Sequence, residues 1–210
     1  MYRIITIERE YGCGAADIAA ELARHLGWKL WDQQLTEEIA KLAQVDPSVV
    51  RRCDERVDSK FHRLARVFWR GSFERSTPLA VMDTFDADRM MALMQQVLEK
   101  VVSEGHCVVV GRGAPYFLRE RGDAFHVFLY ASRPEKLRRV LQTGKTREEA
   151  EELLNTVDSD RMTFIKHYFN ADWPTRCLYH MMLNTAVGNE NVVSTILTTM
   201  QTLEKRLTYK

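Results

Sequence analysis

Residues 3–26 read RIITIEREYGCGAADIAAELARHL and contain a strand, a glycine turn and a helix in that order. The β-branched run 3–7 predicts a buried strand, and apolar residues three and four positions apart over 15–26 predict a helix. The turn 8–14 between them contains Gly12 and Gly14. A tight turn of this kind directs backbone N–H groups and the positive end of a helix at one point, so it predicts an anion site and favours phosphate.

The turn departs from the strict phosphate-loop signature G-x-x-x-x-G-K-[ST]. Gly14 fits the second glycine, but Arg9 stands at the first position, and Ala15 and Ala16 replace the lysine and the hydroxyl residue. In enzymes that carry the signature, the lysine reaches the β- and γ-phosphates and the hydroxyl binds magnesium. A plain strand-to-helix turn without a ligand is therefore the alternative interpretation.

Composition and charge indicate a globular protein. The 210 residues are 45% hydrophobic and 10% aromatic, which is enough for one large domain or a domain with an insertion. The net charge of +1 argues against nucleic acid or an anionic membrane as partner. The four cysteines are scattered and form no zinc-binding pattern, and no metal ligand is assigned. No signal peptide or membrane span is recognised, so we expect a cytoplasmic protein.

Two polar residues follow strands at positions where α/β sheets bind ligands. Asp32 ends the short strand 28–31, where it could bind substrate hydroxyls or a metal-bound water, or cap the next helix. Arg112 follows the unbroken apolar run 107–110, which is typical of a central parallel strand. Its guanidinium suits bidentate phosphate binding, and pairing with a structural carboxylate is the alternative.

Residues 33–104 are predicted to be an inserted helical region. Within it, 51–75 is rich in arginines and aromatics, which fits either a phosphate site or a solvated amphipathic face. The aromatics Phe68, Trp69 and Phe73 fit either a homodimer contact or the core. The methionines of the amphipathic helix 86–104 are interpreted as core residues.

The remaining chain continues the strand–helix alternation of a parallel sheet. A strand is predicted at 125–130, helices at 132–143 and from a capping box at Thr146 to about 169, a last strand at 180–184 and a last helix at 191–207. The two middle helices are basic and could form a lid over phosphates, although charged helix faces are usually only solvated.

Several of these pieces together resemble the cytidylate kinase-like family, relatives of bacterial cytidylate kinases among the P-loop nucleoside monophosphate kinases. They occur in family order over nearly the whole chain, and only 46–85 carries little of the pattern. The matching pieces are Ile4-Ile5-Thr6-Ile7, Arg9-Glu10-Tyr11-Gly12-Cys13-Gly14, Trp31-Asp32, Val108-Val109-Val110-Gly111-Arg112-Gly113-Ala114, Asp158 with Arg161, Trp173, Tyr179-His180 and Leu183-Asn184-Thr185.

The resemblance implies a single P-loop NTPase-like domain over 1–210, with a three-layer α/β/α architecture and a five-stranded parallel sheet. It implies an acceptor-binding helical insertion at 33–104 and lid-like helices at 133–170. The implied reaction is transfer of the γ-phosphoryl group of ATP to the small-molecule nucleotides CMP or dCMP with Mg²⁺, without nucleic acid or membrane partners.

The resemblance also implies roles for single residues. Asp32 and Arg112 would face the acceptor, and the lid arginines Arg139 and Arg161 would stabilise the transferring phosphoryl group. Arg9 could replace the charge of the missing lysine. Because phosphoryl transfer needs positioning and charge stabilisation, the expected catalytic residues are arginines. The donor phosphates would lie against Gly12, Cys13, Gly14, Ala15 and Ala16.

Three hypotheses follow, because the turn departs even from the polar residues common in this family after its Arg-Glu-Tyr-Gly-x-Gly pattern. The first is a cytidylate kinase-like phosphotransferase that uses Arg9 and the lid arginines. The second is a pseudokinase-like module that binds a nucleotide without transferring phosphate, which Ala15 and Ala16 favour. The third is a kinase for another small acceptor, because the insertion that sets acceptor choice is the least recognisable region.

Overall fold

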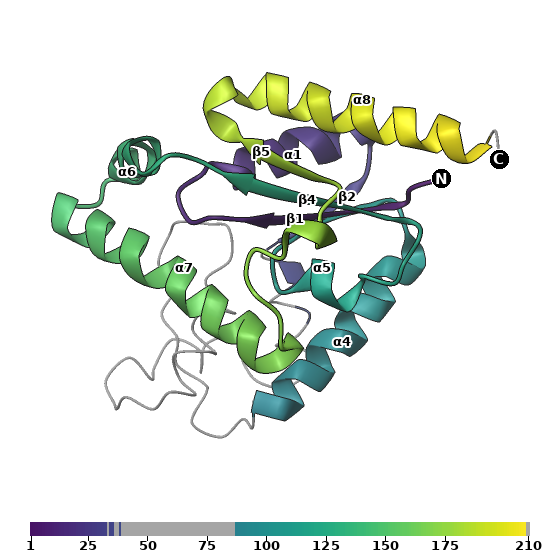
Figure 1. Ribbon diagram of the computed structural model, residues 1–210, viewed down its shortest axis with the longest axis horizontal. Helices are drawn as coiled ribbons and strands as arrows, with labels where there is room; N and C mark the ends of the chain where they lie inside the picture. Colours follow the sequence, from purple (N-terminus) through teal and green to yellow (C-terminus); the bar gives the residue numbers. More distant parts are fainter. Residues whose placement is uncertain (33, 36–37, 39–86, 209–210) are drawn as a thin grey trace.

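The computed structural model describes residues 1–32, 34–35, 38 and 87–208, and in them five strands form one parallel sheet (Figure 1). The strand order is β2-β3-β1-β4-β5, and every neighbouring pair is parallel. The five-stranded parallel sheet predicted from the sequence is confirmed. The strands are β1 (Ile4–Arg9), β2 (Lys29–Trp31), β3 (Cys107–Val110), β4 (Ala124–Tyr130) and β5 (Met181–Asn184).

The helices lie in layers on both faces of the sheet. In Figure 1, α1 (Ala15–Leu26) and α8 (Asn189–Thr208) cover one face, and α4 (Ala87–Glu104), α5 (Ala114–Phe117) and α7 (Arg147–Phe169) cover the other. The helix α6 (Arg133–Gln142) lies beyond the carboxyl ends of the central strands. Two 3-10 turns, η3 (Arg176–Leu178) and η4 (Thr185–Val187), flank β5. The result is the expected three-layer α/β/α arrangement.

The central strands are apolar because both of their faces are covered. Ile5 and Ile7 of β1 pack in the core under α1 and α8, whereas Ile4 packs in the core under α4 and α7. The strand extends beyond the predicted 3–7, so Glu8 and Arg9 belong to β1 rather than to the turn. Both are buried although they are charged.

The register brings two turns together at the carboxyl edge. Ile7 of β1 pairs with Val110 of β3 on one side and with Val127 of β4 on the other. The N–H of Gly111 donates to the carbonyl of Ile7 over 2.8 Å. The turn after β3 therefore lies directly beside the turn after β1, as expected for neighbouring parallel strands.

Most predicted helices are confirmed within two residues. The capping box at α7 is present: the Glu149 N–H donates to Thr146 Oγ1 over 3.2 Å, and the Thr146 N–H donates to Glu149 Oε2 over 2.9 Å. Between β3 and β4 the helix α5 has only four residues. At the end of the predicted insertion, α4 packs in the core against β3. The interpretations of segment 51–75, with Phe68, Trp69 and Phe73, concern residues outside the described ranges.

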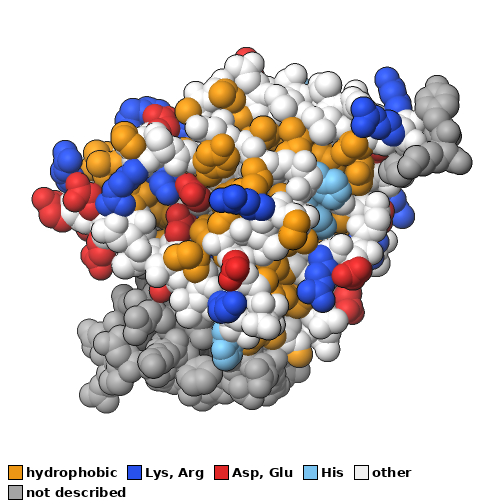
Figure 2. Space-filling view, in the orientation of Figure 1, with side chains coloured by type: hydrophobic (Ala, Val, Ile, Leu, Met, Phe, Trp, Pro, Cys, Tyr) orange, Lys and Arg blue, Asp and Glu red, His pale blue; other side chains and the backbone are white. Residues whose placement is uncertain are grey.

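The described surface carries both signs of charge. On the face in Figure 2, basic and acidic side chains are interspersed, in keeping with the net charge of +1. None of the helices in the described ranges is both long and apolar enough to cross a membrane.

Candidate functional site

The turn after β1 has the backbone shape predicted for an anion site. Gly12 and Gly14 have φ angles of 75° and 80°, in the left-handed region that favours glycine. Gly14 is the N-cap of α1, and no side chain caps that helix end by a hydrogen bond. The positive end of α1 therefore meets the turn without a side-chain acceptor, which is the arrangement that binds anions.

Packing against α6 is a second reason for both glycines. A Cβ at Gly12 would lie 2.9 Å from Val140 Cγ2 and 3.2 Å from the Lys136 carbonyl oxygen, and one at Gly14 would lie 3.0 Å from Arg139 Nη1. Since real Cβ contacts are longer, α6 can approach the turn this closely only over glycine. The sequence motif alone could not distinguish this packing role from phosphate binding.

The turn after β3 presents Arg112 in an unusual conformation. Gly111, Arg112 and Gly113 all have positive φ angles, of 65°, 60° and 66°. For arginine this region costs on the order of 1–3 kcal/mol, and such strain is often found at functional sites. The side chain is nevertheless buried, with 7% of its residue surface exposed. A strained, buried cation at the edge of the sheet supports the predicted site.

Arg112 lies in a cluster of buried charges. Burial lowers the pKa of Arg112, and the neighbouring Asp32 carboxylate opposes that change. Arg9 and Arg161 lower the same pKa further, because they are cations within electrostatic range, and Glu8 raises it. The structure therefore brings together four predicted site residues, Asp32, Arg9, Arg112 and Arg161, from three strand ends and one helix. Glu8 joins them without having been predicted.

Arg9 fills the space over the second turn. Its Nη1 lies 3.4 Å from Glu8 Oε1, and a Cβ at Gly111 would lie only 2.7 Å from Arg9 Cζ. The glycine at 111 is therefore required for this position of the guanidinium. Arg9 Nε is buried and has no hydrogen-bond partner within the described part of the chain. An N–H of this kind favours an acceptor oxygen from a bound molecule.

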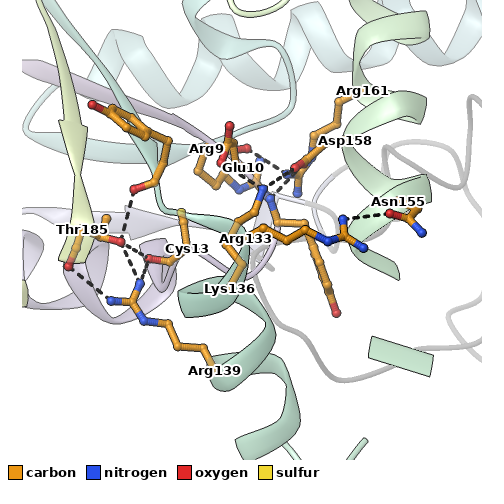
Figure 3. Close-up of polar contacts among 12 residues, drawn as sticks. Arg9, Glu10, Cys13, Arg133, Lys136, Arg139, Asn155, Asp158, Arg161 and Thr185 are labelled. Atoms are coloured by element: carbon orange, nitrogen blue, oxygen red, sulfur yellow. Dashed lines mark hydrogen bonds and ion pairs between the residues drawn. The ribbon is translucent and has the colours of Figure 1, made fainter. Parts of the chain in front are cut away.

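Side chains of α7 and α6 hold the first half of the β1 turn (Figure 3). Asp158 Oδ1 accepts the Tyr11 N–H over 2.8 Å, and Arg161 Nη1 donates to Asp158 Oδ1 over 2.9 Å and to the Arg9 carbonyl over 2.8 Å. Lys136 Nζ lies 3.0 Å from Glu10 Oε2 and 3.5 Å from Asp158 Oδ2. Burial lowers the pKa of Arg161, and the nearby charge of Arg9 acts in the same direction.

Arg139 occupies a different place from the other three predicted arginines. It donates to the Cys13 carbonyl, to Thr185 Oγ1 over 2.7 Å and to the Thr185 carbonyl over 3.2 Å. Its Nε also lies 2.8 Å from Glu135 Oε1. It therefore contacts the backbone of the turn, whereas the cluster of Arg9, Arg112 and Arg161 lies at the ends of β1 and β3.

Cys13 lies inside the turn but is not suited to be a nucleophile. Its thiol is buried, and burial raises its pKa to about 12. The thiol is therefore protonated at neutral pH, whereas the thiolate is the reactive form. Predicted contact of this residue with phosphate would have to use its backbone.

The sequence analysis assigned no role to several residues of the site. The spacing of Asp158 and Arg161 by three positions on one helix signals a pair on the same face, and Lys136 with Arg139 has the same spacing on α6. Glu8 has no such signal, because its burial follows from the extension of β1. The residues without an assigned role are Glu10, which lies in the turn, and Lys136, Asp158 and Thr185, which contact it.

Comparison with known proteins identifies the fold. The chain is similar to an uncharacterized protein of Eubacterium ventriosum, with a TM-score of 0.65 and 16% identity over 93% of this chain and 96% of that one. It is also similar to shikimate kinase from Acinetobacter baumannii in complex with shikimate (TM-score 0.52, 15% identity, 96% and 94% covered). Shikimate kinase from Bacteroides thetaiotaomicron gives a TM-score of 0.51 at 14% identity, with 96% and 98% covered. No curated protein matches the chain.

At these low identities the solved structures show a fold shared with small-molecule kinases. The family comparison goes further: the sequence model described as the cytidylate kinase-like family matches residues 4–187. The match covers all five strands, both glycine turns and α7. With most of its length matched, the chain belongs to the cytidylate kinase-like family.

Proposed function

We propose that this protein is a nucleoside monophosphate kinase that transfers the γ-phosphoryl group of ATP to CMP or dCMP. The observation that supports this most strongly is the meeting of Arg9, Arg112 and Arg161 at the carboxyl edge of the sheet, the edge at which α1 begins after β1. Phosphoryl transfer requires little covalent chemistry from the protein and depends on positioning and on charge stabilisation. Buried guanidinium groups next to backbone N–H donors are suited to both tasks.

In this proposal the two turns divide the substrates between them. The backbone of residues 12–16 binds the donor phosphates, and Asp32 with Arg112 binds the acceptor. Arg9 ends β1 between the two turns and has a buried Nε–H without a partner in the described ranges, so it is the candidate to replace the missing lysine. Arg161 supports Arg9 through the bond to its carbonyl.

The charges of the site indicate how a metal ion would fit. The four cations Arg9, Arg112, Arg161 and Lys136 are balanced by the four carboxylates Glu8, Glu10, Asp32 and Asp158. Donor phosphates would add negative charge, which a bound Mg²⁺ neutralises in phosphoryl transfer. Ala16 offers no hydroxyl ligand, and no group of three metal-binding side chains occurs within the described residues. The described residues therefore offer no cage of protein ligands, and a Mg²⁺ ion at this site would be carried by the nucleotide phosphates.

Two observations favour a second candidate, a module that binds a nucleotide without transferring phosphate. Ala15 and Ala16 remove the side chains that normally contact the transferred group. In addition, the Tyr11 N–H of the turn already donates to the chain's own Asp158 carboxylate. Loss of one charged contact in a transition state typically lowers the rate by about a hundredfold or more.

The acceptor is the least constrained part of the proposal. The segment expected to select it includes residues 39–86, which lie outside the described ranges. The fold is shared with kinases of shikimate, so an acceptor that is not a nucleotide is the third candidate. An acceptor panel should therefore contain CMP, dCMP, other nucleoside monophosphates and shikimate.

The test combines binding and turnover on one sample. We expect calorimetry to detect binding of ATP-Mg and of CMP, and a coupled assay to detect ADP release that depends on CMP. Binding of both without ADP release would favour the second candidate. ADP release with another acceptor of the panel but not with CMP or dCMP would favour the third. Absence of binding to both ATP-Mg and CMP would contradict all three and leave the glycine turn as a structural feature.

A further inference from the structure

The carbonyl of Cys13, in the middle of the turn after β1, accepts hydrogen bonds from two side chains. Thr185 Oγ1 donates to this oxygen over 2.7 Å, and Arg139 Nη1 also donates to it (Figure 3). Arg139 comes from α6, whereas Thr185 follows β5, so three distant parts of the chain meet at one peptide group. We call Arg139 and Thr185 the Cys13 clamp.

Each nitrogen of the Arg139 guanidinium has a partner. Nε pairs with Glu135, Nη1 binds the Cys13 carbonyl and Thr185 Oγ1, and Nη2 binds the Thr185 carbonyl. Thr185 is fully buried. If Arg139 turned away to contact a phosphate, it would give up its hydrogen bonds to the Cys13 carbonyl and to Thr185, which costs free energy. The geometry therefore keeps Arg139 on the turn.

The clamp has a direct consequence for anion binding. In a planar trans peptide, the carbonyl and the N–H point in opposite directions. Holding the Cys13 carbonyl toward Arg139 and Thr185 therefore directs the Gly14 N–H to the opposite side. Gly14 is the N-cap of α1, so this N–H begins the series of donors at the positive helix end.

We propose that Arg139 and Thr185 are positioning residues for the donor site: they fix the Cys13–Gly14 peptide so that its N–H faces the donor phosphates. This inference rests on the proposed function. It gives Arg139 a role different from contact with the transferring phosphoryl group. It also explains how the turn keeps its shape although Ala15 and Ala16 contribute no polar side chain.

Matched variants test the hydroxyl of the clamp. Thr185→Val keeps the shape of the side chain and removes the hydrogen bonds, and Thr185→Ser keeps the hydroxyl. We expect Thr185→Val to raise the Kd for ATP-Mg about tenfold, as loss of a buried hydrogen bond to the turn implies, and Thr185→Ser to restore it. The acceptor KM at saturating ATP should change much less. An unchanged Kd in folded Thr185→Val would overturn the inference.

The role of Arg139 is tested by comparing it with Arg138, its neighbour on α6. Arg139→Ala should raise the Kd for ATP-Mg about tenfold or more, and the double variant with Thr185→Val should lose less than the two single effects combined. Arg138→Ala is the control, because Arg138 also pairs with Glu135 but its side chain is 55% exposed and has no described contact with the turn. A fall in kcat at saturating ATP with an unchanged Kd would instead show that Arg139 contacts the transferring group.

Hydrogen exchange separates failure of this inference from failure of the proposed function. Amide exchange of residues 10–18 should be faster in Thr185→Val than in the wild type, with or without nucleotide. If the wild type binds no ATP-Mg, the proposed function and the donor-site role both fail, whatever the exchange shows. If the wild type binds ATP-Mg but both variants bind it equally well, only the positioning role fails.

Discussion

The two glycine turns at the carboxyl edge of the sheet follow neighbouring parallel strands but are held in different ways. The turn after β1 is fastened by side chains of α6, α7 and Thr185, which bind its carbonyls and the Tyr11 N–H. The turn after β3 has three consecutive residues with positive φ, and the middle one is the buried Arg112. Contacts from other elements therefore hold the turn after β1, whereas the turn after β3 has a strained backbone at Arg112.

This difference separates two uses of glycine. In the first turn the glycines allow α6 to approach, so the loss of Gly12 should disturb packing. In the second turn Gly111 gives room to the Arg9 guanidinium, so its loss should disturb a charged side chain. A glycine-rich motif in a sequence therefore indicates a close approach, but it does not say whether a ligand, a helix or a side chain makes that approach.

The largest effect is expected from Arg112, which joins the second turn to the proposed acceptor. Arg112→Ala should lower kcat/KM with ATP and CMP by about a hundredfold or more, because a buried guanidinium next to Asp32 is lost. Arg112→Lys should rescue activity only in part, since lysine lacks the planar fork. Steady-state kinetics with varied CMP measure kcat/KM for both variants.

Arg121→Ala is a suitable control for the same change of charge. Arg121 pairs with Asp123 over 2.8 Å near the amino end of β4, away from both turns. The activity of Arg121→Ala should equal that of the wild type. If Arg112→Ala retained activity within a few-fold of wild type, the second turn would have no role in the acceptor site.

The next largest effect is on stability, and it differs between Gly12 of the first turn and Gly111 of the second. Gly12→Ala should lower the free energy of unfolding by about 2–3 kcal/mol, because the new Cβ meets Val140 and the backbone of α6. Gly111→Ala should cost about 1–2 kcal/mol, because the flexible Arg9 side chain can move away. Its activity should instead fall to the level of Arg9→Ala. Chemical denaturation and kinetics on the same variants measure the two quantities.

Gly27→Ala measures the contribution of backbone strain alone. Gly27 has a φ of 64°, and a Cβ there would meet nothing within 4 Å. Its cost should be about 1 kcal/mol, as for a left-handed non-glycine residue. If Gly12→Ala cost no more than Gly27→Ala, packing against α6 would not be what requires glycine in the first turn.

A smaller effect is expected from pH, and it acts on the sheet that carries both turns. Burial, with a further contribution from His180, lowers the pKa of His126 to about 4, although a hydrogen bond involving the Leu118 backbone opposes this. Because the unfolded chain binds a proton near pH 6.5, stability from this group is complete above that pH and is lost as the pH falls toward 4. Between pH 6.5 and 5 the loss should be about 1–2 kcal/mol.

Chemical denaturation at several pH values tests this prediction. The free energy of unfolding is measured for the wild type, His126→Gln and the exposed His25→Gln. The His126 variant should show a flatter dependence of stability on pH, whereas the His25 variant should follow the wild type. A steep dependence in both variants would assign the acid sensitivity to other groups. Since the effect concerns the whole sheet, it should not distinguish between the two turns.

The sequence predicted most of the fold because its signals are local. The unbroken apolar run before Gly111 identified β3, and the Thr146–Glu149 spacing identified the start of α7. Asp32, Arg9 and Arg112 could be expected near one another because the carboxyl ends of parallel strands share an edge. Their proposed roles in catalysis and binding remain predictions.

Contacts between distant segments could not be predicted in the same way. Nothing in the basic pattern of α6 indicates that Arg139 binds a carbonyl, whereas its neighbour Arg138 is exposed. That difference depends on Thr185, which is placed against the turn by the pairing of β5 with β4. The burial of Glu8 likewise depends on the whole sheet, since a glutamate before a glycine turn is usually solvated.

The smallest effect concerns the capping box of α7, the helix that fastens the first turn. Thr146→Ala removes one of two reciprocal hydrogen bonds and should lower the free energy of unfolding by about 1 kcal/mol. Asp158 lies twelve residues further along α7, about 18 Å from the cap, so the Kd for ATP-Mg should not change. Thr146→Ser keeps the acceptor oxygen and should behave as the wild type. Weaker ATP binding in Thr146→Ala, but not in Thr146→Ser, would mean that the first turn depends on the position of the whole helix and not on the local contacts of Asp158 and Arg161. Local side-chain contacts would then no longer distinguish the first turn from the second.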